Sequence, residues 1–220
     1  MNAIILGGLT LKIAVLVILA YLLGSFPSGV IVGKIFYHRD IRQFGSGNIG
    51  TTNTFRVLGR PAGLLVLALD ILKGTVAASL PVWFGLGLPH YAILAFGVAA
   101  ILGHSFSIFI KFAGGKAVAT SAGVLLAYNP SFFVIAASTF VIIMLLSSMV
   151  SVASMLGMIL ITLFSLFYRD PFLTALAAAL TIFIFIRHRE NIKRIRQGTE
   201  NLVPFGWYYH HQHKPKPPKQ

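Results

Sequence analysis

The chain has 220 residues, of which 56% are hydrophobic and only 10% are charged. Soluble domains carry about 25% charged residues, so this composition argues against a soluble enzyme and favours a membrane protein. Lys and Arg outnumber Asp and Glu by 18 to 5, which favours anionic lipid or anionic substrates over nucleic acid, because the basic residues lie on no soluble domain. Cysteine is absent, which excludes a disulfide and a thiolate nucleophile.

Apolar runs of about 20 residues can cross a bilayer as helices. The sequence contains seven such runs, near residues 11–36, 61–85, 91–111, 117–128, 131–146, 150–168 and 171–186. The first is interrupted by Gly24, Pro27 and Gly29, and the fourth is short. We therefore expect an all-α integral membrane protein with seven transmembrane helices, forming a single domain over residues 1–206.

The basic residues predict the orientation of these helices. Residues 34–60, 111–116 and the segment from residue 187 onward hold 15 of the 18 Lys and Arg residues. Seven crossings place these three segments on one side, and cytoplasmic loops carry such an excess. We expect the N-terminus outside and the C-terminus in the cytoplasm. Residues 207–220, rich in Pro, Lys and His, are expected to form a disordered cytoplasmic tail.

A glycine-rich segment, "FGSGNIGTTN", covers residues 44–53 and contains the spacing G-x-G-x-x-G. It follows a hydrophobic helix instead of a strand, which argues against a dinucleotide-binding fold. Glycines still let backbone N–H groups converge on an anion, and an arginine fork suits phosphate. An ordinary polar loop is the alternative. The candidate anion-binding residues are Gly45, Ser46, Gly47, Asn48, Gly50, Thr51, Thr52, Asn53 and Arg56.

A second basic, glycine-rich segment lies near residues 103–120, "GHSFSIFIKFAGGKAVAT". Gly114 and Gly115 free the backbone there, and Lys116 places a charge at the start of the next helix, where anions bind favourably. His104 is either a structural histidine or part of this site. The alternative for "GGK" is a charge that only sets the topology.

A third segment, "RHRENIKRIRQGTEN", covers residues 187–201. His188 and Asn191 share one helical face, and we interpret them as site residues or as part of a helix that contacts anionic lipid. Asp70 and Lys73 lie one turn apart inside the second apolar run. We interpret them as a mutually neutralising pair, with a functional role as the alternative.

Acidic residues are scarce, since the chain contains only Asp40, Asp70, Asp170, Glu190 and Glu200. This leaves little for a carboxylate-based metal site, so we expect neither a metal nor a cofactor. The His-x₄-Asp acyltransferase signature is also absent. Chemistry on anionic substrates that relies on positioning and charge neutralisation is compatible with this inventory.

In their order, "YLLGSFPSG", "GSGNIGTTN", "LDILKG", "GHSF", "GGKAVAT" and "RHRENIKRIRQGTEN" resemble the bacterial acyl-phosphate:glycerol-3-phosphate acyltransferases of the PlsY type, over about residues 20–201. The resemblance implies a multi-pass enzyme of the bacterial inner membrane whose active site faces the cytoplasm. Such enzymes move a fatty acyl group from acyl phosphate to the 1-hydroxyl of glycerol 3-phosphate, giving lysophosphatidic acid and phosphate. The implied partners are both substrates, membrane lipids and a soluble acyl-phosphate synthase.

The resemblance also implies residue roles. Ser46, Asn48 and the surrounding glycines hold the acyl-phosphate headgroup near Arg56. Lys116, with Gly114 and Gly115, binds the phosphate of glycerol 3-phosphate. His188 and Asn191 complete the site, and Glu190 anchors the loops.

The chain departs from the family at three positions of the second segment. The family reads "FKGGKG", whereas Ala113 and Ala117 stand here in place of its first Lys and last Gly, and Ser107 stands where the family often has Pro. Lys111 is a substitute for the missing charge. The acceptor of the hydroxyl proton is left open between His188, with His104 in reserve, and a phosphate oxygen of a substrate. The competing functions are an organic-phosphate transporter or channel and a structural protein with basic, lipid-binding loops.

Overall fold

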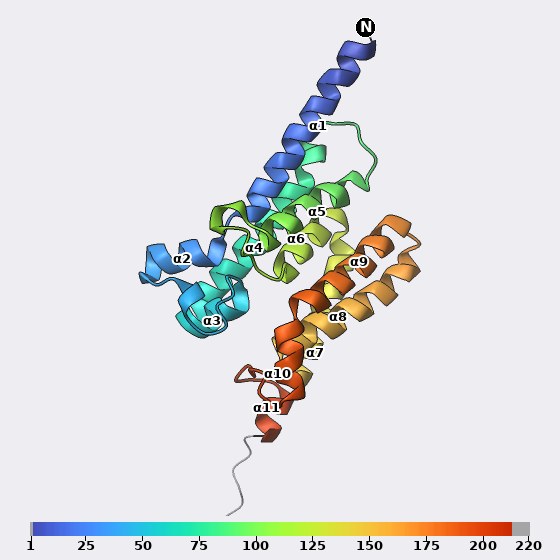
Figure 1. Ribbon diagram of the computed structural model, residues 1–220. Coiled ribbons are helices and arrows are strands. Elements are labelled where there is room, and N and C mark those ends of the chain that lie inside the picture. The colour runs from blue at the N-terminus through green and yellow to red at the C-terminus, as the bar shows by residue number, and fades with distance from the viewer. Residues whose placement is uncertain (1, 213–220) are drawn as a thin grey trace, which may run out of the picture. The chain divides into compact units, whose positions relative to one another are not determined.

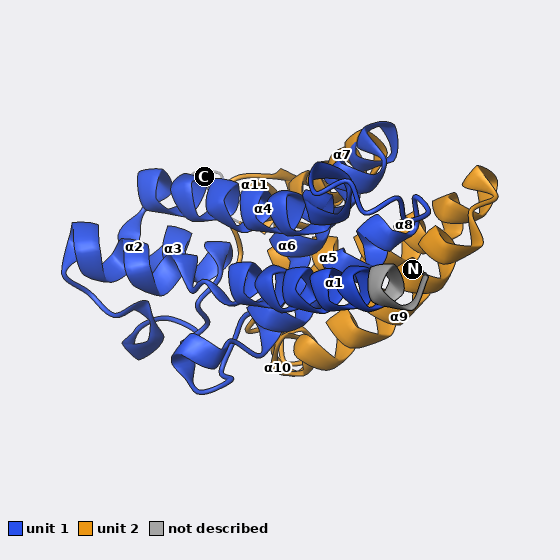
Figure 2. Cartoon of the chain, turned by 90° about the horizontal axis from the view of Figure 1, so that it is seen from above, with its two compact units in different colours: residues 1–133 blue, residues 134–220 orange. Residues whose placement is uncertain are grey.

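The computed structural model describes the backbone of residues 2–212 and the side chains of residues 7–212, and within that range all regular secondary structure is helical. The chain forms two compact units, residues 1–133 and 134–220, shown in blue and orange in Figure 2. Because all regular secondary structure in the described residues is helical, the predicted all-helical fold class is confirmed. The single domain over residues 1–206 stays a prediction.

The first unit contains six α-helices and two short 3₁₀ helices in the described range (Figure 1). They are α1 (Asn2–Ser25), α2 (Ser28–Tyr37), η1 (Ile41–Gln43), α3 (Thr51–Leu58), α4 (Arg60–Trp83), α5 (Ala92–Ser105), η2 (Ile108–Ile110) and α6 (Val118–Tyr128). Helix α4 packs on α1, α5 and α6, and its buried face joins an apolar cluster with α1 and α5.

Helix α7 (Pro130–Ser147) starts in the first unit and continues into the second. The second unit then contains α8 (Val150–Ser165), η3 (Leu166–Tyr168), α9 (Pro171–Arg187), α10 (Arg189–Arg196) and α11 (Trp207–Gln212). Helices α8 and α9 form an antiparallel hairpin, in which the hydroxyl groups of Thr162 and Thr181 lie 2.9 Å apart. This contact gives both hydroxyls a partner inside an apolar pair of helices.

Five segments of the described chain are long and apolar enough to cross a membrane, by length and composition: Gly7–Ser25, Arg60–Trp83, Ala92–Ile110, Pro130–Ser147 and Val150–Tyr168. Helices α9 and α10 pass the same test only as a pair, bent by 61°. The expected fourth crossing corresponds to α6, which has 11 residues. Seven crossings and the orientation of the termini therefore stay predictions.

The expected first crossing, 11–36, is two helices in the structure. Helix α1 ends at Ser25, and α2 begins at Ser28 and turns away from it (Figure 1). Pro27 explains the break, because proline cannot donate to the preceding turn and disfavours a helical residue before it. Ser107 Oγ donates to the Ser25 carbonyl oxygen, and Tyr21 Oη donates to the carbonyl oxygen of Phe106 at 2.7 Å. Both bonds tie the end of α1 to the segment that follows α5.

The predicted disordered tail differs from the structure at its start. Residues Trp207–Gln212 form α11, and the Tyr209 amide donates to Ser148 Oγ at 2.9 Å. Ser148 lies between α7 and α8 and is fully buried, so the tail segment is held by a polar group of the helix connection. Residues 213–220 lie outside the described part of the chain.

Glycines set the close packing of α4 against α6. A Cβ atom on Gly74 would lie 2.3 Å from the Thr120 carbonyl oxygen, and one on Gly123 would lie 2.0 Å from the carbonyl oxygen of Ile71. Each helix therefore presents a glycine to the other's backbone, an arrangement typical of helices that pack in membranes. In the sequence of α4, these contacts are marked only by single glycines in an apolar run, so the sequence alone does not identify the partner helix.

Replacing Gly74 by alanine should destabilise the protein, because the added methyl group would overlap the Thr120 carbonyl oxygen. We expect a loss on the order of 1–3 kcal/mol, typical of overpacking, measured as a lower melting temperature in detergent. Gly8→Ala is the matched control, since a Cβ atom there would meet nothing within 4 Å. Equal melting temperatures for the two variants would contradict the tight α4–α6 contact.

Candidate functional site

The two glycine-rich segments of the first unit meet at one apolar cluster. The cluster contains Val30, Ile41, Ile49 and Ile110. Ile49 belongs to the first segment, and Ile110 belongs to the second, four residues before Gly114. The fold therefore brings together the two segments that the sequence predicted as anion-binding sites.

The backbone of the first segment requires two of its glycines. Gly45 and Gly47 have φ values of 61° and 69°, in the left-handed region that favours glycine. A Cβ atom on Gly45 would also lie 2.4 Å from Asn53 Oδ1 and 3.4 Å from Arg56 Cδ. The tight turn thus places the stem of Arg56 beside Gly45.

Asn53 builds the loop from inside. Its Oδ1 accepts from the Ser46 amide at 2.9 Å, and its Nδ2 donates to the carbonyl oxygens of Ile41 and Phe44 at 3.0 and 3.2 Å. The side chain is 1% exposed. Sequence reasoning selected Asn53 as a substrate contact, but its amide is used by the loop itself, so the geometry gives it a structural role.

Of the other predicted residues of the segment, some hold the loop together and others are exposed at its surface. Asn48 Oδ1 accepts from the Gly50 amide at 2.9 Å, which closes a turn just before α3. Ser46, Thr52 and Arg56 are exposed. Asn48 and Thr51 are half-buried.

Gly114 and Gly115 serve a different purpose from the one predicted. Their amides donate to the carbonyl oxygens of Ser105 and His104, at 3.2 and 3.0 Å, so those N–H groups are paired with protein instead of being presented to an anion. A Cβ atom on Gly114 would lie 2.1 Å from the His104 carbonyl oxygen. These glycines let the segment lie flat against the end of α5, and Lys116 follows directly at the start of α6.

The family departures in this segment have structural correlates. Ala117 has a φ of 60°, the left-handed conformation that glycine adopts without strain, and it caps the start of α6. A non-glycine residue there costs about 1–2 kcal/mol, which the surrounding fold has to supply. Ser107 replaces a proline by a residue whose hydroxyl bonds to α1. Ala113 is exposed, and so is Lys111.

His104 lies behind the second segment. It is 4% exposed, and a Cβ atom on Gly115 would lie 2.2 Å from its Nε2. Its Nδ1 lies 3.8 Å from Asp70 Oδ1. His104 therefore supports the segment from the helix side. Asp70 in turn pairs with Lys73 at 2.8 Å, as the sequence predicted.

In the second unit, His188 marks the 61° bend between α9 and α10. Its Nδ1 lies 2.8 Å from the Ile184 carbonyl oxygen. Because a carbonyl oxygen only accepts, Nδ1 carries the proton, and Nε2 is the accepting atom of the neutral ring. The last turn of α9 thus fixes the tautomer of His188.

Glu200 is the anchor of this unit, a role that the sequence analysis assigned to Glu190. Glu200 Oε1 accepts from Asn191 Nδ2 at 2.7 Å and from Ser151 Oγ at 2.9 Å, and Oε2 accepts from Arg194 Nε at 2.8 Å. The side chain of Glu200 is 5% exposed, whereas that of Glu190 is 69% exposed and lies 3.7 Å from its neighbour Arg189. Glu200, and not Glu190, therefore makes the anchoring hydrogen bonds in this unit.

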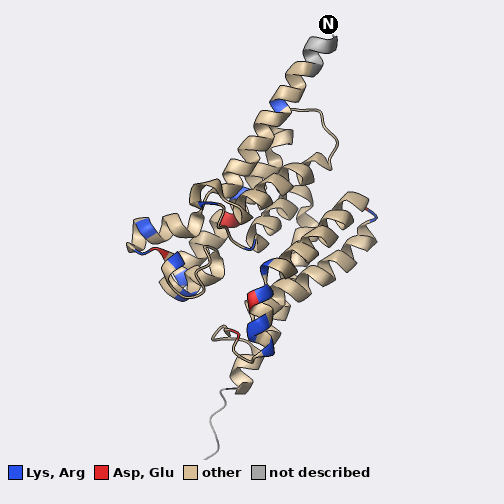
Figure 3. Ribbon diagram, in the orientation of Figure 1, with Lys and Arg blue, Asp and Glu red and all other residues tan. Residues whose placement is uncertain are grey.

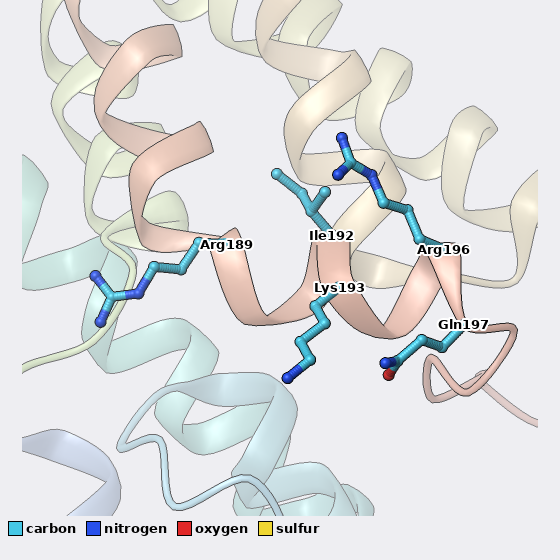
Figure 4. Close-up of a pocket in the computed structure, with 5 residues that line it drawn as sticks. All are labelled: Arg189, Ile192, Lys193, Arg196 and Gln197. Atoms are coloured by element: carbon cyan, nitrogen blue, oxygen red, sulfur yellow. The ribbon is translucent and has the colours of Figure 1, made fainter.

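The exposed face of α10 is strongly basic. A shallow cavity of about 430 Å³ is lined by Arg189, Ile192, Lys193, Arg196 and Gln197, which Figure 4 shows extending from the helix. Lys and Arg gather along α10, and separately around α2 and α3 (Figure 3). Such faces attract anionic headgroups or phosphate.

The loop before the first segment has its own ion pair. Arg42 donates to Asp40 through Nε at 2.9 Å, and this side-chain hydrogen bond lowers the pKa of Asp40 to about 2. Lys34 Nζ lies 3.7 Å from the same carboxylate. Asp40 therefore stays ionised at any pH near neutrality and caps η1, accepting from the Arg42 amide.

Residues 14–198 match the family described as glycerol-3-phosphate acyltransferase. The chain is 57% identical to the glycerol-3-phosphate acyltransferase of Latilactobacillus sakei over 93% of this chain and 98% of the relative, and 59% identical to that of Enterococcus faecalis over 89% and 94%. It is also similar to the crystal structure of PlsY, an integral membrane glycerol 3-phosphate acyltransferase, in its glycerol 3-phosphate form. That likeness has a TM-score of 0.79 at 38% identity and covers 87% of this chain and 96% of that chain. The lysophosphatidic acid form gives a TM-score of 0.78 at 37% identity, over 87% and 95%.

Glu200→Gln should destabilise the second unit, because one of the three donors would then face an amide N–H instead of a carboxylate oxygen. We expect a loss on the order of 2 kcal/mol, as for hydrogen bonds to charged groups, seen as a lower melting temperature. Glu190→Gln is the control, and its exposed side chain predicts almost no change. If Glu190→Gln were the more damaging variant, the assignment of the anchor would be wrong.

Proposed function

We propose that this chain, which belongs to the glycerol-3-phosphate acyltransferase family, transfers a fatty acyl group from acyl phosphate to the 1-hydroxyl of glycerol 3-phosphate. The products are 1-acylglycerol 3-phosphate (lysophosphatidic acid) and inorganic phosphate, in the first acylation of phospholipid biosynthesis. One observation carries the proposal beyond family membership. Ile49, in the segment that carries Ser46 and Arg56, and Ile110, a few residues before Lys116, belong to one apolar cluster, which supports a common site for the two basic groups.

Both substrates are anions, so binding them side by side requires positive charge and alignment. Arg56 offers a planar fork for the acyl-phosphate headgroup, with Ser46 and Thr52 exposed beside it. Lys116 offers a point charge for the phosphate of glycerol 3-phosphate. The hydroxyl oxygen attacks the acyl carbon, the bond from that carbon to the phosphate oxygen breaks, and phosphate leaves. The same cations stabilise the negative charge that develops on the oxygens.

The hydroxyl proton is assigned to a phosphate oxygen of a substrate. Four of the five carboxylates are held by donors: Asp40 by Arg42, Asp70 by Lys73, Asp170 by backbone amides of α9, and Glu200 by three side chains. The fifth, Glu190, is exposed beside Arg189. A carboxylate in such a pair is a poor base, whereas the departing phosphate is generated where the proton is released. The donor is already activated, so no covalent enzyme intermediate is required.

His188 and Asn191 are assigned to this reaction by the motif that they share with the family. The fixed tautomer of His188 leaves Nε2 as its acceptor, which suits orientation of a hydroxyl group. Asn191 Nδ2 donates to Glu200, which fixes the position of the Asn191 side chain on α10.

The membrane arrangement is part of the same proposal. Residues 1–206 form one domain with seven crossings in the bacterial inner membrane, with the N-terminus outside and the active site and C-terminus in the cytoplasm. The basic segments support this orientation through the positive-inside rule. The acyl chain lies among membrane lipids, and a soluble acyl-phosphate synthase supplies the donor.

Purified protein in detergent, given labelled glycerol 3-phosphate, should form lysophosphatidic acid with palmitoyl phosphate and none with palmitoyl-CoA. Ser46→Ala and Lys116→Ala should each abolish the product, because each removes a group that aligns one substrate. Product from palmitoyl-CoA would contradict the assignment of acyl phosphate as the donor. Folded protein that is inactive with both donors, yet moves glycerol 3-phosphate across vesicle membranes, would support the transporter.

Arg56→Lys should lower kcat/KM by about tenfold or more, because an ammonium group does not reproduce two parallel hydrogen bonds to phosphate. Steady-state kinetics with varied acyl phosphate measures the effect. Arg60→Lys is the control, since Arg60 is exposed at the start of α4, outside the segment. Near-normal kinetics for Arg56→Lys would count against Arg56 as a phosphate clamp.

A further inference from the structure

The buried polar network around Asp70 extends well beyond a pair of neutralising charges. Lys73 Nζ lies 2.8 Å from Asp70 Oδ1 and also donates to the Phe26 carbonyl oxygen at 2.8 Å. Ser28 Oγ donates to the same Asp70 oxygen at 2.9 Å. The side chains of Asp70 and Lys73 are 3% and 7% exposed, so these contacts form inside the helix bundle.

The network holds the break between α1 and α2. Phe26 and Ser28 flank Pro27, where the helix hydrogen bonding is interrupted. The ammonium group of Lys73 meets a carbonyl oxygen at the C-terminal end of α1, which the helix dipole makes favourable. Ser28 is the first residue of α2. The pair on α4 therefore fixes the direction in which α2 leaves α1.

The direction of α2 decides where the first glycine-rich segment lies. A Cβ atom on Gly29, in the first turn of α2, would lie 2.1 Å from the Ile49 carbonyl oxygen and 3.1 Å from Thr54 Oγ1. Such close backbone contact transmits a tilt of α2 directly to the segment that carries Ser46. We call this series of contacts, from Asp70 through Ser28 and Gly29 to Ile49, the first arm of the network. A second arm also begins at Asp70.

The second arm runs through His104. Its Nδ1 lies 3.8 Å from Asp70 Oδ1, and its ring packs on Gly115, whose amide donates to the His104 carbonyl oxygen at 3.0 Å. Lys116 is the next residue. One carboxylate oxygen thus faces both the start of α2 and the histidine that supports the second segment.

We propose that Asp70 and Lys73 are positioning residues for the acyl transfer, which set the separation of the two phosphate-binding segments. Stability alone is a weak reason to bury such a pair, because uncharged residues of similar volume often pack as well or better. A pair that ties two loops to one helix has a second reason to be charged. The proposal rests on the proposed function only for the identity of the two substrates.

The double variant Asp70→Asn/Lys73→Met tests this role without leaving one charge buried alone. We expect it to fold, with a melting temperature near that of the wild type, and to lose 10- to 100-fold in kcat/KM, the order of loss that misalignment of reacting groups produces. The affinity for glycerol 3-phosphate, measured by calorimetry without donor, should weaken about tenfold. Wild-type kinetics and affinity in the folded double variant would overturn the proposal.

Lys12→Met is the matched control. Lys12 Nζ donates to the Phe84 carbonyl oxygen at 2.8 Å, the same kind of lysine-to-helix-end bond in the same unit. We expect wild-type kinetics from this variant. If the wild type and Lys12→Met were both inactive with every donor, the proposed function would fail. Activity in both, beside an unaffected double variant, would remove the positioning role alone.

Ser28→Ala keeps the proposal testable if the double variant does not fold, because it removes only the bond to Asp70 and leaves the ion pair. Ser28→Ala should therefore affect only the first arm, which leads from Asp70 through α2 to the segment that carries Ser46. We expect a several-fold higher KM for acyl phosphate, with little change in the KM for glycerol 3-phosphate or in melting temperature. Unchanged KM values for both substrates would contradict the positioning role.

Discussion

Opposite charges inside an apolar helix bundle have to neutralise each other, because the surrounding hydrocarbon offers neither of them a partner. Asp70 and Lys73 do so at 2.8 Å, one turn apart on α4. Asp70 also accepts from Ser28 Oγ, and Lys73 donates to the Phe26 carbonyl oxygen, so both groups bond to residues at the α1–α2 break. A break in a membrane helix exposes backbone groups that need partners, and Lys73 supplies one for the Phe26 carbonyl oxygen. The loop after the break can then carry polar chemistry.

Close helix packing and loop geometry both depend on glycines. At these positions one backbone approaches another so closely that a side chain would not fit. Gly74 on α4 meets the Thr120 carbonyl oxygen, and Gly29 on α2 meets that of Ile49. Neither contact can relax much without moving a whole helix. The Gly29 contact holds the first glycine-rich segment against α2, and a loop held in this way is suited to aligning reactants.

Hydropathy was sufficient to predict an all-helical chain, and the spacing of one helical turn predicted the Asp70–Lys73 pair, because both depend on near neighbours. The Gly–Pro interruption was recognised, but it was placed inside one expected crossing, 11–36, whereas α1 ends at Ser25 and α2 begins at Ser28. Side-chain direction within a loop does not follow from residue type, so Asn53 was selected as a substrate contact although its amide holds the loop together. Glu200 was missed because Ser151, one of its partners, lies 49 residues away and no spacing rule connects them. The paired amides of Gly114 and Gly115 likewise depend on how α5 ends.

The late position of Glu200 in the chain bears on how the protein is made. Its three partners, on Ser151, Asn191 and Arg194, leave the ribosome earlier and lack their acceptor until residue 200 follows. Both glycine-rich segments are by then already synthesised, because they precede residue 200 in the chain. A nascent or truncated polypeptide therefore presents α10 without its anchor.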